Sequence, residues 1–291
     1  MSRLSLPDWL TFRRFAGVTT GMTTLLVMLG VYTSATGAGL ACMAQWPLCD
    51  NGLLPQTIPS FIEWFHRLWA MITGFFIAGT ALWALRSAVQ RRVKVAFTAA
   101  VVLLPLQISI GAVTVTLNGL LPGGYTPLTH GAHLFTALSI FTALTLGTVF
   151  AYDGRFRTDV TTRAKRALGV ALGALVVSLL SSRMVTVIPY DPTMQAVFYG
   201  ATLVAYAGLL TAAVWLGRTA RSRLRYATVP AVALVFLHLA LGRDLVYYDD
   251  TVLLVNLVVV GLAGLLTAGL AVAVGRDDGG RNRTRGVTSG D

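Results

Sequence analysis

The chain has 291 residues, of which 55% are hydrophobic and only 12% are charged, and its formal net charge at pH 7 is +11. Soluble globular domains carry about 25% charged residues, so this composition excludes that class. The sequence predicts an all-α polytopic membrane protein.

Eight apolar stretches are long enough for a transmembrane helix, which takes about 20 residues. They lie near 14–35, 61–85, 95–116, 127–150, 165–183, 193–216, 227–246 and 251–274. We expect two tandem four-helix bundles, over 1–152 and 153–276. A polar, Gly-rich tail over 277–291 has no apolar period and is expected to be disordered and cytoplasmic.

The basic residues are placed unevenly along the chain. All but three of the 23 Lys and Arg flank the expected spans on one side of the membrane; the exceptions are Arg67, Arg183 and Arg243. By the positive-inside rule, both termini are then expected in the cytoplasm and the protein in the plasma membrane. The positive net charge is thus explained by the membrane topology, and the basic residues are also expected to attract anionic lipid head groups. Nucleic acid is not expected as a partner.

The loop between the first two spans contains the only two cysteines, Cys42 and Cys49, on either side of Trp46 and Pro47. The charge pattern places this loop outside the cytoplasm, where such a pair commonly oxidises. A disulfide is therefore expected, with free thiols as the alternative. A metal site is disfavoured, because two thiols without a neighbouring His supply too few ligands.

Glu63 is the only Glu in the chain, and it precedes His66 by three residues at the start of the second span. On a helix the two side chains share one face about one turn apart. A salt bridge to Arg67 is the alternative role for Glu63. An Asp would serve a salt bridge equally well, and the chain uses Asp for all its other acids.

Three motifs follow one another in this part of the chain: Gly37-x-Gly39-Leu40-x-Cys42, then Trp46-Pro47-x-Cys49, then Glu63-x-x-His66-Arg67. With them, the sequence resembles the haem A synthase family over residues 30–75 and, less specifically, to about 145. The resemblance implies a haem-dependent oxidoreductase that oxidises the ring methyl of haem O to a formyl group, giving haem A for terminal oxidases. It implies a catalytic Glu63, with His66 and His133 on the haem iron and Arg67 in the haem-binding site.

The positions of His66 and His133 agree with that role. They lie about five and six residues into spans that both run inward, so at 1.5 Å per residue they share a depth within roughly 10 Å of the outer surface. An interfacial His with an ordinary interhelical hydrogen bond is the alternative, although ionisable groups inside spans are usually functional. His130 lies one turn nearer the head groups and competes with His133 for the ligand role; we favour His133. His238 is assigned a packing or hydrogen-bonding role, with a ligand role as the alternative.

An internal repeat relates the two halves. Residues 101–116 align without gaps on 232–247, which places Gln107 on His238 and Gly111 on Gly242. Continuing the alignment places Asn256 on His133 and Tyr199 on His66. Repeats of four spans share their orientation and are related by an axis along the membrane normal, and four-helix bundles build cofactor sites from facing helices. The family typically holds haem b in its second half through two His, and this sequence has neither.

The expected partners are haem O, the farnesyltransferase that makes haem O, the terminal oxidase and membrane lipid; a homo-oligomer is left open. Three alternatives stay open as functions. A b-type haem electron carrier would use the same His pair without Glu63, and an oxidase assembly factor would bind haem without turnover. A transporter would explain parallel repeats, but helices broken by Gly and Pro at the midplane are not obvious.

Overall fold

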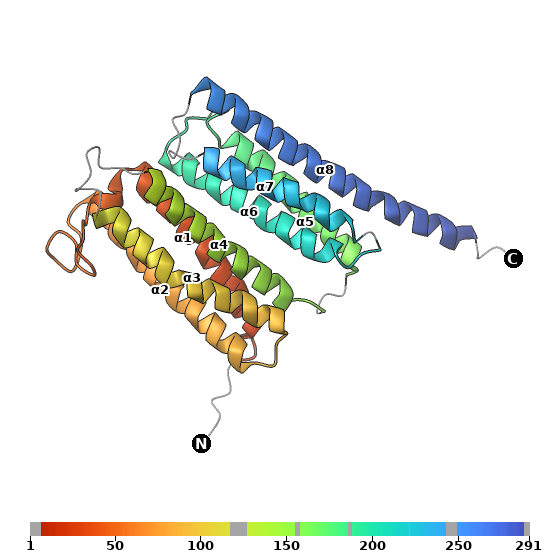
Figure 1. The fold of residues 1–291 in the computed structure, drawn as a ribbon, viewed down its shortest axis with the longest axis horizontal. Coiled ribbons are helices and arrows are strands. Elements are labelled where there is room, and N and C mark those ends of the chain that lie inside the picture. Colours follow the sequence, from red (N-terminus) through yellow and green to blue (C-terminus); the bar gives the residue numbers. More distant parts are fainter. Residues whose placement is uncertain are drawn as a thin grey trace, which may run out of the picture. The chain divides into compact units, whose positions relative to one another are not determined.

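The computed structural model describes residues 7–116, 127–154, 158–185, 188–220, 222–242 and 249–287. Within these ranges the chain forms eight α-helices, one short 3₁₀ helix and no β-strand beyond an isolated bridge. The predicted all-α class is confirmed (Figure 1). The end of the seventh expected span, 243–246, lies outside the described residues.

The chain divides into two units. The first contains residues 1–155 and 191–196, and the second contains 156–190 and 197–291. The first therefore holds α1 (Phe12–Ala35), α2 (Ile58–Arg86), α3 (Arg91–Thr116) and α4 (Pro127–Ala151). The second holds α5 (Val160–Leu180), most of α6 (Pro192–Leu216), α7 (Leu224–Leu241) and α8 (Asp250–Val287). Helix α8 continues past Asp277, where the tail was expected to begin.

In the first unit, α1 packs on α2 and α4, and α3 packs on the same two helices. Helices α2 and α4 therefore lie diagonally across a ring of four. At the end of the bundle away from the α1–α2 loop, Phe97 and Leu144 are fully buried in an apolar core with Ala84. Many large apolar side chains face outward instead, among them Phe75, Val102, Ile108 and Phe135. Such an exterior is typical of helices that contact lipid.

Seven of the eight helices are long and apolar enough to cross a membrane, and α5 is the exception among the described residues. The expected count of eight spans is therefore one higher than this criterion supports. Arg163, Lys165 and Arg166 occupy the first turns of α5, which leaves only 167–180 as its uncharged part. Burying such charges in a bilayer is costly.

Short polar residues begin several of these helices. The hydroxyl of Thr57 accepts a hydrogen bond from the Ser60 N–H, and Pro59 follows at the start of α2. The Asp159 carboxylate accepts one from the Thr162 N–H before α5. These contacts satisfy backbone donors that a helix start leaves unpaired, and Pro is favoured there because its missing N–H is not needed.

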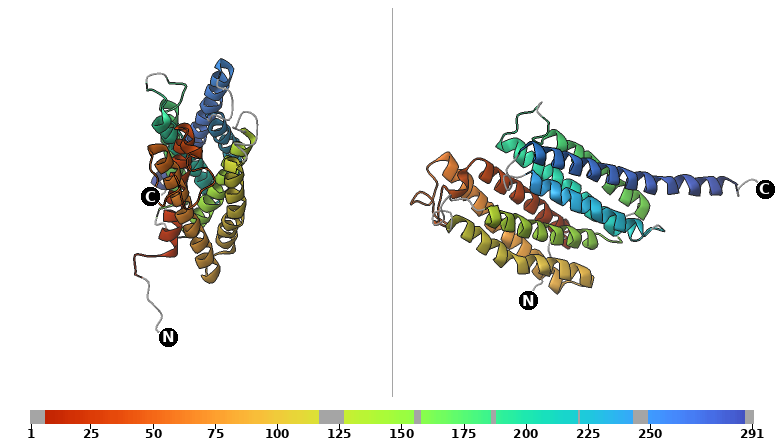
Figure 2. Two further views of the ribbon diagram at one scale, coloured as in Figure 1. Left: turned by 90° about the vertical axis from the view of Figure 1, so that its left-hand side faces the viewer. Right: turned by 45° about the horizontal axis from the view of Figure 1, so that its top comes forward.

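A buried polar network joins the helices of the second unit. The His238 Nδ1 lies 2.6 Å from the Asn256 Oδ1, and its Nε2 lies 3.0 Å from the Ser178 hydroxyl. Ser178 in turn lies 2.6 Å from the Thr202 hydroxyl. The network therefore joins α5, α6, α7 and α8, which run side by side in Figure 2. His238 has the packing and hydrogen-bonding role that its mid-span position predicted.

The His238 network predicts a stability effect. Replacing His238 with Ala leaves the buried Asn256 and Ser178 groups without their imidazole partner, and each such group costs about 1–3 kcal/mol. The variant should unfold at a lower temperature in detergent than the parent chain. A variant at the exposed, lipid-type position Val229→Ala is the control on the same helix. Equal unfolding temperatures for His238→Ala and the parent would contradict the role given to the network.

Candidate functional site

The loop between α1 and α2 is built by local hydrogen bonds and one covalent bond (Figure 1). Gly37 has a φ of +71°, a conformation that glycine adopts without strain, and it turns the chain into the 3₁₀ helix Ala38–Leu40. Cys42 and Cys49 form a disulfide, which confirms the predicted pairing. Two backbone hydrogen bonds between Cys49 and Gly52, of 3.0 and 2.9 Å, close the next turn.

Asp50 ties the end of this loop to the first turn of α2. One carboxylate oxygen accepts the Gln56 N–H at 2.8 Å, and the other accepts the Ser60 hydroxyl at 2.9 Å. The hydrogen bond from the Gln56 N–H has the larger effect, and together with the one from the Ser60 hydroxyl it holds the pKa of Asp50 below its usual range. A lowered carboxyl pKa stabilises the folded loop above the ordinary Asp pKa of about 4, and the effect is lost as the pH falls through the lower, folded-state value.

Glu63 is 2% exposed and joins the loop to α2. One carboxylate oxygen accepts the backbone N–H of Cys42 at 2.5 Å, and the other forms an ion pair with Arg67. The Arg67 guanidinium also donates to the carbonyls of Gln45, at 2.8 Å, and of Met43, at 2.7 Å. The predicted salt bridge between Glu63 and Arg67 therefore forms. The contact of the carboxylate with the disulfide loop was not predicted, and the catalytic role of Glu63 stays a prediction.

The described contacts of Arg67 are with this loop and Glu63. A direct contact between Arg67 and haem stays a prediction. Trp64 adds another connection, because its indole N–H donates to the carbonyl of Pro47 at 3.1 Å. The first three turns of α2 thus hold the loop through Ser60, Glu63, Trp64 and Arg67.

His66 and His133 lie on α2 and α4, the diagonal pair of the ring. His66 follows the first residue of α2, Ile58, by eight positions, and His133 follows the first residue of α4, Pro127, by six. At 1.5 Å of rise per residue, His66 therefore lies only about 3 Å farther from the start of its helix than His133 lies from the start of α4. Both side chains are partly buried.

Each imidazole lies against a glycine of a neighbouring helix. The His66 ring lies against Gly30 of α1, and the His133 ring against Gly111 of α3. Gln107, one turn before Gly111, brings its amide nitrogen to 2.9 Å from the His133 Nε2 and 3.2 Å from its Nδ1. His133 is thus oriented by two residues of α3. His130 is partly buried one turn before it on α4.

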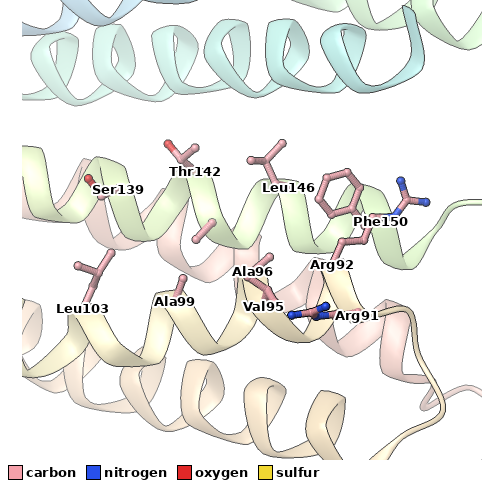
Figure 3. A pocket seen from close by; sticks show the side chains of 11 residues that line it. Arg91, Arg92, Val95, Ala96, Ala99, Leu103, Ser139, Thr142, Leu146 and Phe150 are labelled. Atoms are coloured by element: carbon pink, nitrogen blue, oxygen red, sulfur yellow. The ribbon is translucent and has the colours of Figure 1, made fainter. Parts of the chain in front are cut away.

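A groove in the first unit lies apart from these histidines. It has a volume of about 770 Å³ between α3 and α4, and Leu103 and Ser139 lie toward its His133 end. Figure 3 shows Arg91 and Arg92 at its other end, with Ala99, Thr142 and Leu146 along it. Its lining has neither His nor a carboxylate. The groove is therefore an apolar face of the bundle, separate from the histidine pair.

The sequence pattern did not single out Asp50, Ser60 or the contact between Gln107 and His133. Asp50 directly follows Cys49, and Ser60 lies in the first turn of α2. These positions alone are only a weak indication that the two side chains are hydrogen-bonded. The alignment of Gln107 on His238 was the better signal. The aligned positions pair in both units, as Gln107 with His133 and as His238 with Asn256.

Relatives of this chain fall into two groups. A 122-residue stretch is 39% identical to a protoheme IX farnesyltransferase of Halobacterium salinarum and covers 42% of this chain and 27% of that protein. Haem A synthases of Bacillus licheniformis and Exiguobacterium sp. are 29% and 32% identical over 140 and 159 residues. These two alignments cover 47% and 53% of this chain, and 44% and 50% of the relatives. The matched stretches thus span half or less of each curated relative.

The family match is longer. Residues 13–188 match the family COX15-CtaA, described as cytochrome oxidase assembly protein. This range contains all of α1 to α5 apart from Phe12, and therefore the disulfide loop, Glu63, His66 and His133. Because the match extends over more than half of the chain, the protein belongs to the COX15-CtaA family of cytochrome oxidase assembly proteins.

Proposed function

We propose that the protein is a haem A synthase that oxidises the ring methyl of haem O to a formyl group in the first unit. The observation that supports this most directly is the pair His66 and His133 on the diagonal helices α2 and α4, inside the family-matched part of the chain. The similarity to proteins named haem A synthase also supports this proposal. Haem O is then the substrate, and haem A the product.

The residues of the first unit fit a haem. His is a common protein ligand of haem iron, and His66 and His133 would hold it together, since the porphyrin supplies the other donors. Free metal ions need more protein ligands, and no group of three or more His, Cys, Asp or Glu suited to one occurs among the described residues. The glycines opposite both rings give a second indication, because the same close glycine contact seats both imidazoles.

The haem iron would supply the oxidising chemistry. His66 and His133 would hold the iron, each through one ring nitrogen, and Gln107 would orient the His133 ring through the other nitrogen. Glu63, one turn from His66, places a carboxylate near the edge of that site. Arg67 offsets the Glu63 charge, and both residues bind the disulfide loop to the first turns of α2.

The second unit has different residues at the aligned positions. Tyr199 replaces His66 and donates its hydroxyl hydrogen to the Leu239 carbonyl at 2.7 Å, while Asn256 replaces His133 and contacts His238. Tyr199, Asn256 and His238 are all at most 1% exposed. We therefore assign the haem chemistry to the first unit and a supporting role to the second; haem b, if bound, would compete for the His66 and His133 site.

The farnesyltransferase that makes haem O is the proposed partner. Several proteins named protoheme IX farnesyltransferase contain a stretch similar to this chain, at 34–39% identity. A shared module is consistent with direct transfer of haem O between the two activities. Other proposed partners are the terminal oxidase and lipid of the plasma membrane. The basic residue pattern supports cytoplasmic termini and an extracytoplasmic disulfide loop.

An assembly factor that binds haem without turnover is the second candidate, because the family description names assembly and no chemistry. Incubating the purified protein with haem O, a reductant and oxygen, and then extracting the pigment, separates the two. Haem A in the extract supports the synthase. Haem O recovered unchanged, with the low-spin spectrum present, favours the assembly factor.

The ligand assignment predicts distinct effects for the three histidines. His66→Ala and His133→Ala should each remove or shift the low-spin haem spectrum, because each removes an axial donor. His238→Ala should leave the spectrum largely intact, since His238 is held in the second unit. Pyridine haemochrome quantification and absorption spectra measure both. Loss of haem in His238→Ala alone would overturn the assignment.

Glu63 is predicted to affect turnover more than binding. In Glu63→Gln the amide oxygen can still accept the Cys42 N–H, while the negative charge beside Arg67 is lost. Bound haem should be retained, and conversion to the formyl product should fall by about 100-fold, the lower end of a general acid–base contribution. Glu63→Asp tests whether a shorter carboxylate restores activity. Unchanged conversion in Glu63→Gln would reduce Glu63 to a structural role.

The disulfide is predicted to stiffen the loop without being needed for folding. Closing so short a loop contributes on the order of 2–3 kcal/mol in chain-entropy accounts, and Glu63, Trp64 and Arg67 still hold the loop after reduction. The Cys42→Ser/Cys49→Ser variant should insert, bind haem and retain reduced activity. Non-reducing mass spectrometry of the parent should show one crosslink. A variant that fails to fold, or that is fully active, contradicts this expectation.

A further inference from the structure

The two proposed ligand histidines are seated in the same way. A Cβ atom placed on Gly30 would lie 3.0 Å from the His66 Cε1 and 3.6 Å from its Nε2. A Cβ atom placed on Gly111 would lie 3.1 Å from the His133 Cε1 and 3.6 Å from its Nδ1. In both cases the imidazole therefore occupies space that any other residue would fill with its side chain.

The two glycines also share their place in the fold. Gly30 precedes the last residue of α1, Ala35, by five positions, and Gly111 precedes the last residue of α3, Thr116, by the same number. Each lies on the helix that comes just before the helix of its histidine. The hairpins α1–α2 and α3–α4 thus present their imidazoles through the same glycine contact.

Close packing of two helix backbones is the usual reason for glycine in a membrane helix, and Gly208 shows that case here. A Cβ on Gly208 would meet the Ala167 carbonyl oxygen at 3.0 Å and the Ala171 backbone and Cβ. At Gly30 the three nearest atoms to an added Cβ all belong to the His66 ring, and at Gly111 the two atoms within 4 Å belong to the His133 ring. Glycine destabilises a helix interior by about 1 kcal/mol relative to Ala, so the ring contact offers a reason for glycine at these positions.

We propose that Gly30 and Gly111 are positioning residues that set the orientation of the His66 and His133 rings for axial ligation. This inference rests on the proposed haem site. An added Cβ would push each ring by a few tenths of an ångström, because 3.0 and 3.1 Å are shorter than ordinary carbon–carbon contacts of about 3.5–4.0 Å. At His133, the Gln107 amide constrains the same ring from one turn away.

The test uses the full chain in detergent and titrates it with ferric haem b. Gly30→Ala and Gly111→Ala should still bind the haem, with shifted g-values in the low-spin ferric electron paramagnetic resonance spectrum. Haem transfer to apomyoglobin should be about 10-fold faster, as for other losses of outer support around a metal ligand. Gly21→Ala in α1 and Gly131→Ala in α4 are matched controls, because a Cβ there meets nothing within 4 Å. Spectra and transfer rates equal to those of the controls would overturn the proposal.

A double-mutant cycle keeps the proposal testable if a glycine variant folds poorly. Gly30→Ala should lower the unfolding temperature of the haem-free chain, and the loss should disappear in the His66→Ala background, where the ring is gone. Gly111→Ala and His133→Ala form the second cycle. Additive effects in both cycles would show that the glycines do not act through the rings, and would overturn the proposal.

The same experiments separate this inference from the proposed function. If His66→Ala and His133→Ala keep the low-spin spectrum of the parent, the haem-ligand assignment fails, and the glycine proposal fails with it. If those variants lose the spectrum while Gly30→Ala and Gly111→Ala match their controls, only the glycine proposal fails.

Discussion

The buried carboxylate of Glu63 connects the disulfide loop to the helix that carries His66. It accepts the Cys42 N–H and pairs with Arg67, whose guanidinium holds two further loop carbonyls. A buried charge is tolerated only when it is paired and hydrogen-bonded, and here the loop provides the N–H donor while α2 provides the cation. Removing either side would leave a charge in a poorly solvated place. The loop and the start of α2 therefore behave as one structural element.

The carboxylate that holds the loop also lies one helical turn from His66. Under the proposed function, Glu63 would then have a structural and a catalytic role. The loop is in turn stiffened independently, by the disulfide and by Asp50. Because several contacts share the task, losing one of them should affect the precision of the site before it affects folding.

The two units pair the same aligned positions with different chemistry. Gln107 contacts His133 in the first unit, and His238 contacts Asn256 in the second. In the first unit the imidazole also lies against Gly111, whereas at the aligned Gly242 the nearest side chain is Phe198. Phe198 packs edge-on against His238. In the second unit, aromatic and hydrogen-bonded side chains thus fill this part of the core. In the first unit, the imidazoles of His66 and His133 instead lie against glycines of the neighbouring helices.

Much of this protein follows from the sequence alone. Apolar length predicted an all-helical membrane chain, and the spacing of the two cysteines and of Glu63 and Arg67 predicted the disulfide and the ion pair that the structure shows. These signals are local, or they follow from the composition of whole segments. The sequence analysis counted 165–183 as one of eight spans, but the first turns of α5 carry three basic residues, and α5 does not meet the length and hydropathy criterion that the other seven described helices meet. Only the tertiary structure decided the remaining contacts. Glu63 accepts the Cys42 N–H, and Asp50 accepts the Ser60 hydroxyl. Both ring nitrogens of His238 contact its buried network, and Gly30 and Gly111 face the two other imidazoles. Each of these contacts joins residues from different helices or from a loop and a helix, and depends on how the helices are rotated about their axes, which no periodicity along one segment specifies.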